Sequence, residues 1–181
     1  MSYKWNTRTE LLLGAERMEY LSHCHVLVVG LGGVGAYAAE QICRAGIGHM
    51  TIVDADTVND SNINRQLPAL HSTLGMQKAE VVGQRLLDIN PRLKLTILNE
   101  FLRDERTEEV LSAQKYDFIV DAIDSLSPKA YLLYHAYRRE IPIVSSMGAG
   151  AKIDPSQVKI ADISKTCNCA LAKAVRKRLR G

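Results

Sequence analysis

Residues 25–35 read His-Val-Leu-Val-Val-Gly-Leu-Gly-Gly-Val-Gly, and they are the strongest indication of the fold class. The apolar, β-branched run 25–29 predicts a buried strand, and a small-residue helical pattern follows over 33–45. The glycines at the junction are Gly30, Gly32, Gly33 and Gly35, which contain the pattern G-x-G-x-x-G. Such glycines permit a tight turn and let the backbone approach a phosphate, which the start of a helix attracts. The stretch therefore predicts a nucleotide-binding strand, turn and helix, with a glycine-rich packing turn as the alternative.

Strands and helices are expected to alternate along the rest of the chain. Further strands are predicted at 50–53, 93–98, 117–120, 141–145 and 158–163. Helices are predicted at 8–20, 75–90, 104–113, 128–140 and 170–179, with a long irregular loop over 56–72. This order is typical of a Rossmann-like, doubly wound α/β fold, in which helices cover both faces of a mainly parallel sheet. A length of 181 residues and a hydrophobic content of 46% suit a single domain over residues 1–181.

Composition excludes several classes of protein. The net charge of +3, from 23 basic and 20 acidic residues, is too small to establish a nucleic-acid partner by itself. No apolar stretch approaches the roughly 20 residues that span a bilayer, and the first residues contain no apolar signal region. We therefore expect a cytoplasmic protein with no membrane partner, in which the four cysteines are free thiols.

Polar residues after the second predicted strand suggest which nucleotide is bound. Asp54 ends that strand, where a carboxylate can accept hydrogen bonds from both ribose hydroxyls; capping a turn is the alternative. An NAD-dependent dehydrogenase would share this feature and the glycines. Arg65 and Lys78, with Asn62 as a further donor, instead suit a triphosphate that loses pyrophosphate. Either cation alone would be expected on a solvated surface, and neither is expected in the core.

Two carboxylates follow the buried strand at 117–120. Asp121 and Asp124 would lie where the carboxyl ends of parallel strands meet a ligand. Magnesium is commonly held by one or two carboxylates together with phosphate oxygens. The pair therefore predicts a magnesium site, with N-capping of the next helix as the alternative for Asp124.

Taken in order, these motifs resemble the ubiquitin-activating-type superfamily of adenylating enzymes, whose ATP-binding domain is of the ThiF type. The matching motifs are Gly30-x-Gly-Gly-x-Gly35, Asp54-x-Asp56, Ser61-Asn62-x-x-Arg65-Gln66, Gly75-x-x-Lys78 and Asp121-x-x-Asp124. The resemblance implies ATP and magnesium as cofactors: the ribose at Asp54, the phosphates at Asn62, Arg65 and Lys78, and the metal at Asp124. It also implies a homodimer, because in that superfamily an arginine of the opening helix, here matched by Arg8, reaches the partner subunit's ATP.

The second half of the chain resembles one branch of this superfamily, the tRNA threonylcarbamoyladenosine dehydratases. The matching segments are 148–150, 153–157, 162–166 and the basic run 173–180. The resemblance implies that a carboxylate on modified tRNA is adenylated, after which a ring closes and AMP leaves. It further admits a sulfur-relay protein as a partner. Members of the branch continue beyond the position that matches Gly181, so we expect this chain to lack a C-terminal segment.

Two other functions remain open at this point. An adenylyltransferase for a ubiquitin-like sulfur-carrier protein usually carries two C-x-x-C pairs that bind zinc, whereas this chain has only Cys167-Asn168-Cys169. Two thiolates one residue apart cannot complete a tetrahedral zinc site, so we expect no structural zinc. A non-catalytic nucleotide-binding domain is the other alternative, and the presence of Arg65, Lys78 and Asp124 weighs against it.

Overall fold

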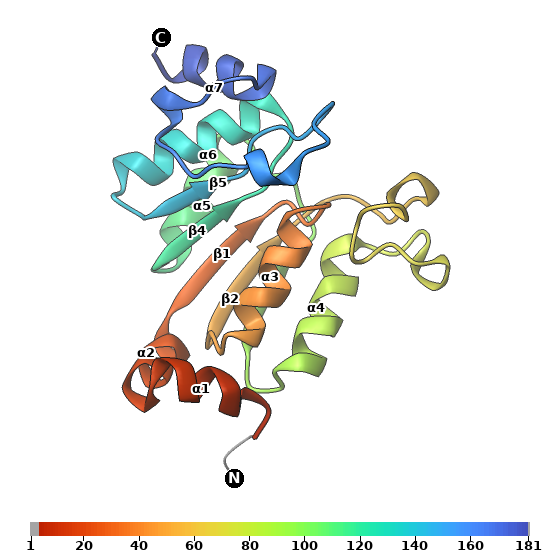
Figure 1. The fold of residues 1–181 in the computed structure, drawn as a ribbon, viewed down its shortest axis with the longest axis vertical. Helices are drawn as coiled ribbons and strands as arrows, with labels where there is room; N and C mark the ends of the chain where they lie inside the picture. Colours follow the sequence, from red (N-terminus) through yellow and green to blue (C-terminus); the bar gives the residue numbers. More distant parts are fainter. Residues whose placement is uncertain (1–3, 181) are drawn as a thin grey trace.

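Five parallel strands form one sheet in the computed structural model, which describes residues 4–180 (Figure 1). The strands are β1 His25–Val29, β2 His49–Val53, β3 Lys94–Leu98, β4 Phe118–Asp121 and β5 Ile143–Ser145. Their order is β3-β2-β1-β4-β5, so the chain runs outward from β1 in one direction and then in the other. The predicted doubly wound parallel sheet is confirmed.

Helices cover both faces of this sheet. They are α1 Thr7–Leu13, α2 Ala15–His23, α3 Gly35–Arg44, α4 Lys78–Ile89, α5 Asp104–Ala113, α6 Leu126–Arg138 and α7 Ala170–Arg180. Helices α3 and α4 pack on one face, α5 and α6 on the other, and α7 lies against α6 (Figure 1). Among the helices of residues 4–180, none combines the length and the apolar character needed to cross a membrane.

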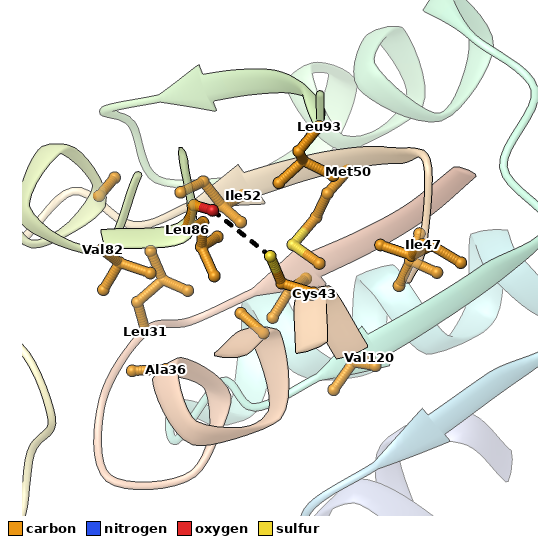
Figure 2. Close-up of a cluster of buried hydrophobic side chains, with 14 of the residues drawn as sticks. Leu31, Ala36, Cys43, Ile47, Met50, Ile52, Val82, Leu86, Leu93 and Val120 are labelled. Atoms are coloured by element: carbon orange, nitrogen blue, oxygen red, sulfur yellow. Dashed lines mark hydrogen bonds between the residues drawn. The ribbon is translucent and has the colours of Figure 1, made fainter. Parts of the chain in front are cut away.

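Successive side chains along each strand point to opposite faces of the sheet, so each face has its own hydrophobic core. Val26 and Val28 of β1 point toward α3 and α4, whereas Leu27 and Val29 point toward α5 and α6. Figure 2 shows the hydrophobic cluster on the face covered by α3 and α4, where the thiol of Cys43 donates a hydrogen bond to the carbonyl of Leu86 (3.4 Å). Because β1 is buried on both faces, its carboxyl end is held rigidly.

The helices predicted at 8–20 and 75–90 differ from the structure. The expected leading helix is two helices, because Gly14, with φ at 84°, breaks the chain between α1 and α2. The helix expected from residue 75 begins at Lys78, since Gly75 has a φ of 80° that no helix accommodates.

The strand predicted at 158–163 is wrong. The side chains of Val158 and Ile160 are 81% and 98% exposed, and no strand forms there. A short 3-10 helix, Ile163–Lys165, begins instead, with the Asp162 carboxylate accepting a hydrogen bond from the backbone N–H of Ser164 (2.9 Å). An alternating pattern specifies a strand only when a neighbouring strand pairs with it, and among the described residues β5 pairs with β4 alone.

Candidate functional site

The carboxyl ends of three adjacent strands bring the sequence motifs together. In the register of the sheet, Val29 of β1 lies beside Val53 of β2 and Asp121 of β4. The backbone N–H of Gly30 donates to the carbonyl of Val53, and that of Ala122 donates to the carbonyl of Val29, both at 2.8 Å. The loops after β1, β2 and β4 therefore start from one edge, at the point where the strand order reverses and open α/β sheets bind ligands.

Two of the motif glycines are required by packing. Gly30 has a φ of 87°, and a methyl group on it would lie 2.8 Å from the carbonyl oxygen of Ala122. A methyl group on Gly35 would lie 1.7 Å from the carbonyl oxygen of Gly30. At Gly32 and Gly33 an added methyl group would meet atoms of residues 65 and 66 only at 3.5 Å or more. Close packing therefore explains why Gly30 and Gly35 are glycines. At Gly32 and Gly33 packing does not require glycine, and the backbone before α3 is accessible there.

The Asp54 carboxylate joins the loops after β1 and β2. Its Oδ2 accepts a hydrogen bond from the backbone N–H of Leu31 (2.6 Å), and its Oδ1 accepts one from Asp56 (2.8 Å). Burial raises the pKa of Asp54, and these two N–H groups and Lys78 oppose that rise. Asp54 thus caps a turn, as the alternative interpretation held, while each oxygen keeps a second lone pair with which to accept from a ribose hydroxyl.

Lys78 is buried, which corrects the expectation that it lies outside the core. Only 4% of the residue is exposed, and its Nζ lies 2.8 Å from Oδ2 of Asp56. The backbone N–H of Lys78 also donates to the carbonyl of Asp56 (2.9 Å). The pair joins the beginning of the loop after β2 to the start of α4, and it holds the ammonium near Asp54.

Asn62 and Arg65 lie on an excursion of the chain between Thr57 and Gln77, which meet again in a β-bridge (Figure 1, yellow). Asn62 is buried, and its Oδ1 accepts a hydrogen bond from the backbone N–H of Asn59 (3.1 Å). It therefore stabilises its own turn. Arg65 is exposed, and its aliphatic stem lies against the backbone of Gly33. Its Nη1 donates to the carbonyl of Ser61 (2.9 Å), which keeps the guanidinium beside the glycine loop.

The two carboxylates at the carboxyl end of β4 have different surroundings. Asp121 has no exposed surface, and its Oδ2 lies 2.6 Å from Nζ of Lys129 and 2.5 Å from Oγ of Ser145. Burial raises the pKa of Asp121, and the ammonium of Lys129 opposes that rise. The expected contact of Asp121 with a cofactor is not supported, because its carboxylate is already bound inside the protein.

Asp124 is the exposed carboxylate of this turn. Ser125, not Asp124, occupies the N-cap position of α6, and Asp124 makes no capping bond there, so the structure does not support the capping alternative. Within residues 4–180, no group of three or more His, Cys, Asp or Glu side chains could hold a metal. A lone exposed carboxylate on the turn that meets the glycine loop nevertheless fits magnesium, which commonly takes its other ligands from phosphate and water.

A small cavity beside Asp124 was not foreseen from the sequence. It has a volume of about 280 Å³ and lies between the first turns of α5 and α6. Its lining residues are Arg103, Asp104, Ser125, Ser127 and Pro128. They come from the starts of α5 and α6, two helices that are far apart in the sequence and pack together in the folded chain.

Arg8 lies far from the glycine loop of its own chain. Helix α1 is at the opposite end of the sheet from the loops that follow β1 and β2 (Figure 1). Arg8 is exposed, α1 buries none of its residues, and Leu11 and Leu12 of the same helix are 76% and 81% exposed. Arg8 therefore cannot reach Arg65 and Lys78 of its own subunit.

The basic terminal helix presents four of its five cations to solvent. They are Lys173, Lys177, Arg178 and Arg180. Arg176 is half-buried instead, and its Nη1 donates to the carbonyl of Thr166 (3.0 Å). Cys169 precedes the helix, and its sulfur accepts hydrogen bonds from the backbone N–H groups of Gly148 (3.3 Å) and Ala172 (3.4 Å). Both Arg176 and Cys169 thus fix the start of α7, while Cys167 is exposed.

Comparison with known proteins agrees with this geometry. The model of the ThiF family matches residues 3–180. The tRNA threonylcarbamoyladenosine dehydratase of Escherichia coli (strain K12) is 39% identical over 99% of this chain, which spans 68% of that protein. The enzyme of the same name from Bacillus subtilis (strain 168) is 42% identical over 96% of this chain, again with 68% of its own length covered. The molybdopterin-synthase adenylyltransferase of E. coli is 32% identical over 75% of this chain and 53% of its own.

Solved structures give the same result. The crystal structure of the E. coli tRNA N6-threonylcarbamoyladenosine dehydratase in complex with ATP superimposes with a TM-score of 0.96 at 39% identity. The match covers 98% of this chain and 73% of that one. The complex of the same enzyme with AMP gives a TM-score of 0.94 and covers 97% of this chain and 71% of that one.

The burial of Lys78 leads to a stability prediction that separates it from Arg65. Lys78→Met should lower the free energy of unfolding by about 1–2 kcal/mol, because it removes a charged hydrogen bond whose acceptor, Asp56, stays half exposed and is partly re-solvated. Arg65→Met should change it by less than about 0.5 kcal/mol, since Arg65 is on the surface. Urea unfolding followed by circular dichroism measures both. Equal stabilities for the two variants would contradict the structural role of Lys78.

Proposed function

The chain belongs to the ThiF family, and on that premise we propose that it is an ATP-dependent tRNA threonylcarbamoyladenosine dehydratase. One observation carries the proposal: the glycine loop, Asp54 and Asp124 converge at one edge of the sheet. This happens in a chain about 40% identical to two enzymes of that name over nearly its whole length. A non-catalytic nucleotide-binding domain would not need Arg65 beside the glycine loop and Lys78 near Asp54.

The proposed reaction has two steps. A carboxylate oxygen of the threonylcarbamoyl group attacks the α-phosphorus of ATP, and the bond to pyrophosphate breaks. A nucleophile within the same group then attacks the acyl carbon, the carbon–oxygen bond to AMP breaks, and a ring closes. The substrate loses one water overall, and its oxygen leaves on AMP. Positioning of the reactants and stabilisation of charge account for the catalysis, so no nucleophile from the protein is needed.

Each site residue has a role in the first step. Asp54 accepts from the ribose, and the open backbone at Gly32 and Gly33 faces the phosphates at the start of α3. Arg65 and Lys78 stabilise charge on the α-phosphate and on the leaving pyrophosphate, with Asn62 holding the loop that carries Arg65. The ammonium of Lys78 has three donors, and the hydrogen bond to Asp56 uses one of them.

Asp124 is the residue that would hold magnesium. When bound, the ion neutralises charge on the phosphate oxygens. The exposed cations of α7, Lys173, Lys177, Arg178 and Arg180, would contact phosphates of the tRNA substrate. An enzyme that consumes ATP and modifies tRNA would act in the cytoplasm.

Turnover of ATP against three candidate substrates tests the function. We expect AMP and pyrophosphate to form with threonylcarbamoylated tRNA, and not with tRNA that lacks this group. Pyrophosphate formed only with a ubiquitin-like sulfur-carrier protein, with AMP left attached to that carrier, would contradict the proposal and favour the adenylyltransferase alternative. A molybdopterin-synthase adenylyltransferase is 32% identical to this chain. Arg65→Met should reduce the rate by roughly 10²-fold, the scale for losing one transition-state donor.

We also infer a homodimer in which Arg8 serves the partner's site. The placement of α1 at the far end of the sheet, with Leu11 and Leu12 exposed, supports this arrangement. An arginine in trans would add a bidentate donor to the triphosphate of the neighbouring subunit.

Mixing two inactive variants tests the sharing of sites. Arg8→Ala and Asp124→Ala homodimers should each be weak, but a heterodimer contains one site with both defects and one with neither. Subunit exchange should therefore restore up to about half of the wild-type rate per heterodimer if the sites act independently. Confirmed exchange without recovered activity would show that Arg8 does not act in trans on an independent site.

A further inference from the structure

The ion pair between Asp121 and Lys129 is the most deeply buried charged contact among the described side chains. Neither residue has exposed surface, and Lys129 is one of the largest side chains in the protein to be fully buried. The ammonium also donates to Oγ of Ser145 (3.2 Å), whose hydroxyl donates to the Asp121 carboxylate. Three neighbouring elements, β4, β5 and α6, thus meet at one charged cluster.

Asp121 uses its second oxygen to shape the turn that follows. Oδ1 accepts a hydrogen bond from the backbone N–H of Ile123 (3.0 Å), the residue before Asp124. The same turn lies against the glycine loop, because the carbonyl of Ala122 closes the space beside Gly30. The orientation of Asp121 therefore sets where Asp124 leaves the sheet and how the turn meets the glycines.

Lys129 is what keeps Asp121 in that orientation. A buried carboxylate without a partner would take up a proton or turn toward water, and either change weakens its hydrogen bond to Ile123. Lys129 lies one helical turn into α6, at 0% exposure, where its charge has no access to a ligand or to solvent. Lys129 therefore acts on the site through its two buried partners, Asp121 and Ser145, and of these Asp121 accepts the hydrogen bond from the turn that carries Asp124.

We propose that Lys129 is a positioning residue: through its ion pair with Asp121 it fixes the turn 121–124 and so places the Asp124 carboxylate for magnesium. The proposal rests on the proposed function, since it assumes that Asp124 meets a metal bound to ATP. It assigns no chemical step to Lys129. It predicts a defect confined to the magnesium-dependent part of ATP binding.

Calorimetry of ATP binding across a magnesium titration tests the proposal. Measurements are made at a temperature where circular dichroism shows every variant fully folded. Lys129→Met should raise the magnesium concentration for half-saturation by roughly 10–100-fold, the range for losing an outer residue that orients a metal ligand. ATP affinity in the presence of EDTA should stay at the wild-type value. If Lys129→Met does not fold, Lys129→Gln retains a donor to Asp121 and should shift the half-saturation in the same direction.

Two further variants separate positioning from general stability. Glu40→Gln removes the charge of another buried carboxylate, paired with Arg44 and Arg85 away from the site, and should leave the magnesium half-saturation unchanged. Asp121→Asn combined with Lys129→Met should recover most of the lost affinity, because the amide oxygen of asparagine again accepts from Ile123 and no buried charge remains.

The outcomes distinguish this inference from the proposed function. A wild-type protein without magnesium-dependent ATP binding would overturn both. If the wild type has it, three results overturn the positioning role alone. They are a normal titration for Lys129→Met, an equal shift for Glu40→Gln, and a defect that persists in full when residue 121 is asparagine.

Discussion

Strand β1 pairs in parallel with β2 on one side and with β4 on the other, so that Val29 lies beside Val53 and Asp121. Everything at the site depends on this register. It places the glycine loop after β1 directly between the loops that carry Asp54 and Asp124. Strand β1 is fully buried on both faces, so these loops are anchored to a well-packed part of the sheet. A few hydrogen bonds are then enough to orient their side chains.

The polar residues at this edge divide into those whose carboxylates are bonded within the protein and those that stay exposed. Asp54, Asp56 and Asp121 each accept hydrogen bonds from the protein itself, and their carboxylates join neighbouring loops or helices. Arg65 and Asp124 stay exposed beside the same loop. The first group gives the second a defined position, which is what a reaction governed by charge stabilisation requires.

Periodicity and glycine chemistry predicted the sheet, because buried parallel strands read as short β-branched runs and the motif residues follow them directly. The sequence could not reveal tertiary pairing. Lys78 looked like a surface cation, and nothing local showed that Asp56 would bury it. The sequence pattern predicted Asp121 as a ligand, but in the folded chain Asp121 forms an ion pair with Lys129 of α6. Residues 158–163 have a strand pattern, but among the described residues no strand pairs with them.

If a carboxylate of the substrate becomes joined to AMP, one oxygen of that carboxylate must leave with AMP, and an isotope label can follow it. The tRNA would carry a threonylcarbamoyl group whose carboxylate is labelled with ¹⁸O, and the AMP from a single turnover would be analysed by mass spectrometry. We expect one labelled oxygen in AMP, because ring closure breaks the acyl carbon–oxygen bond. AMP formed at the same rate without label would contradict adenylation of that carboxylate.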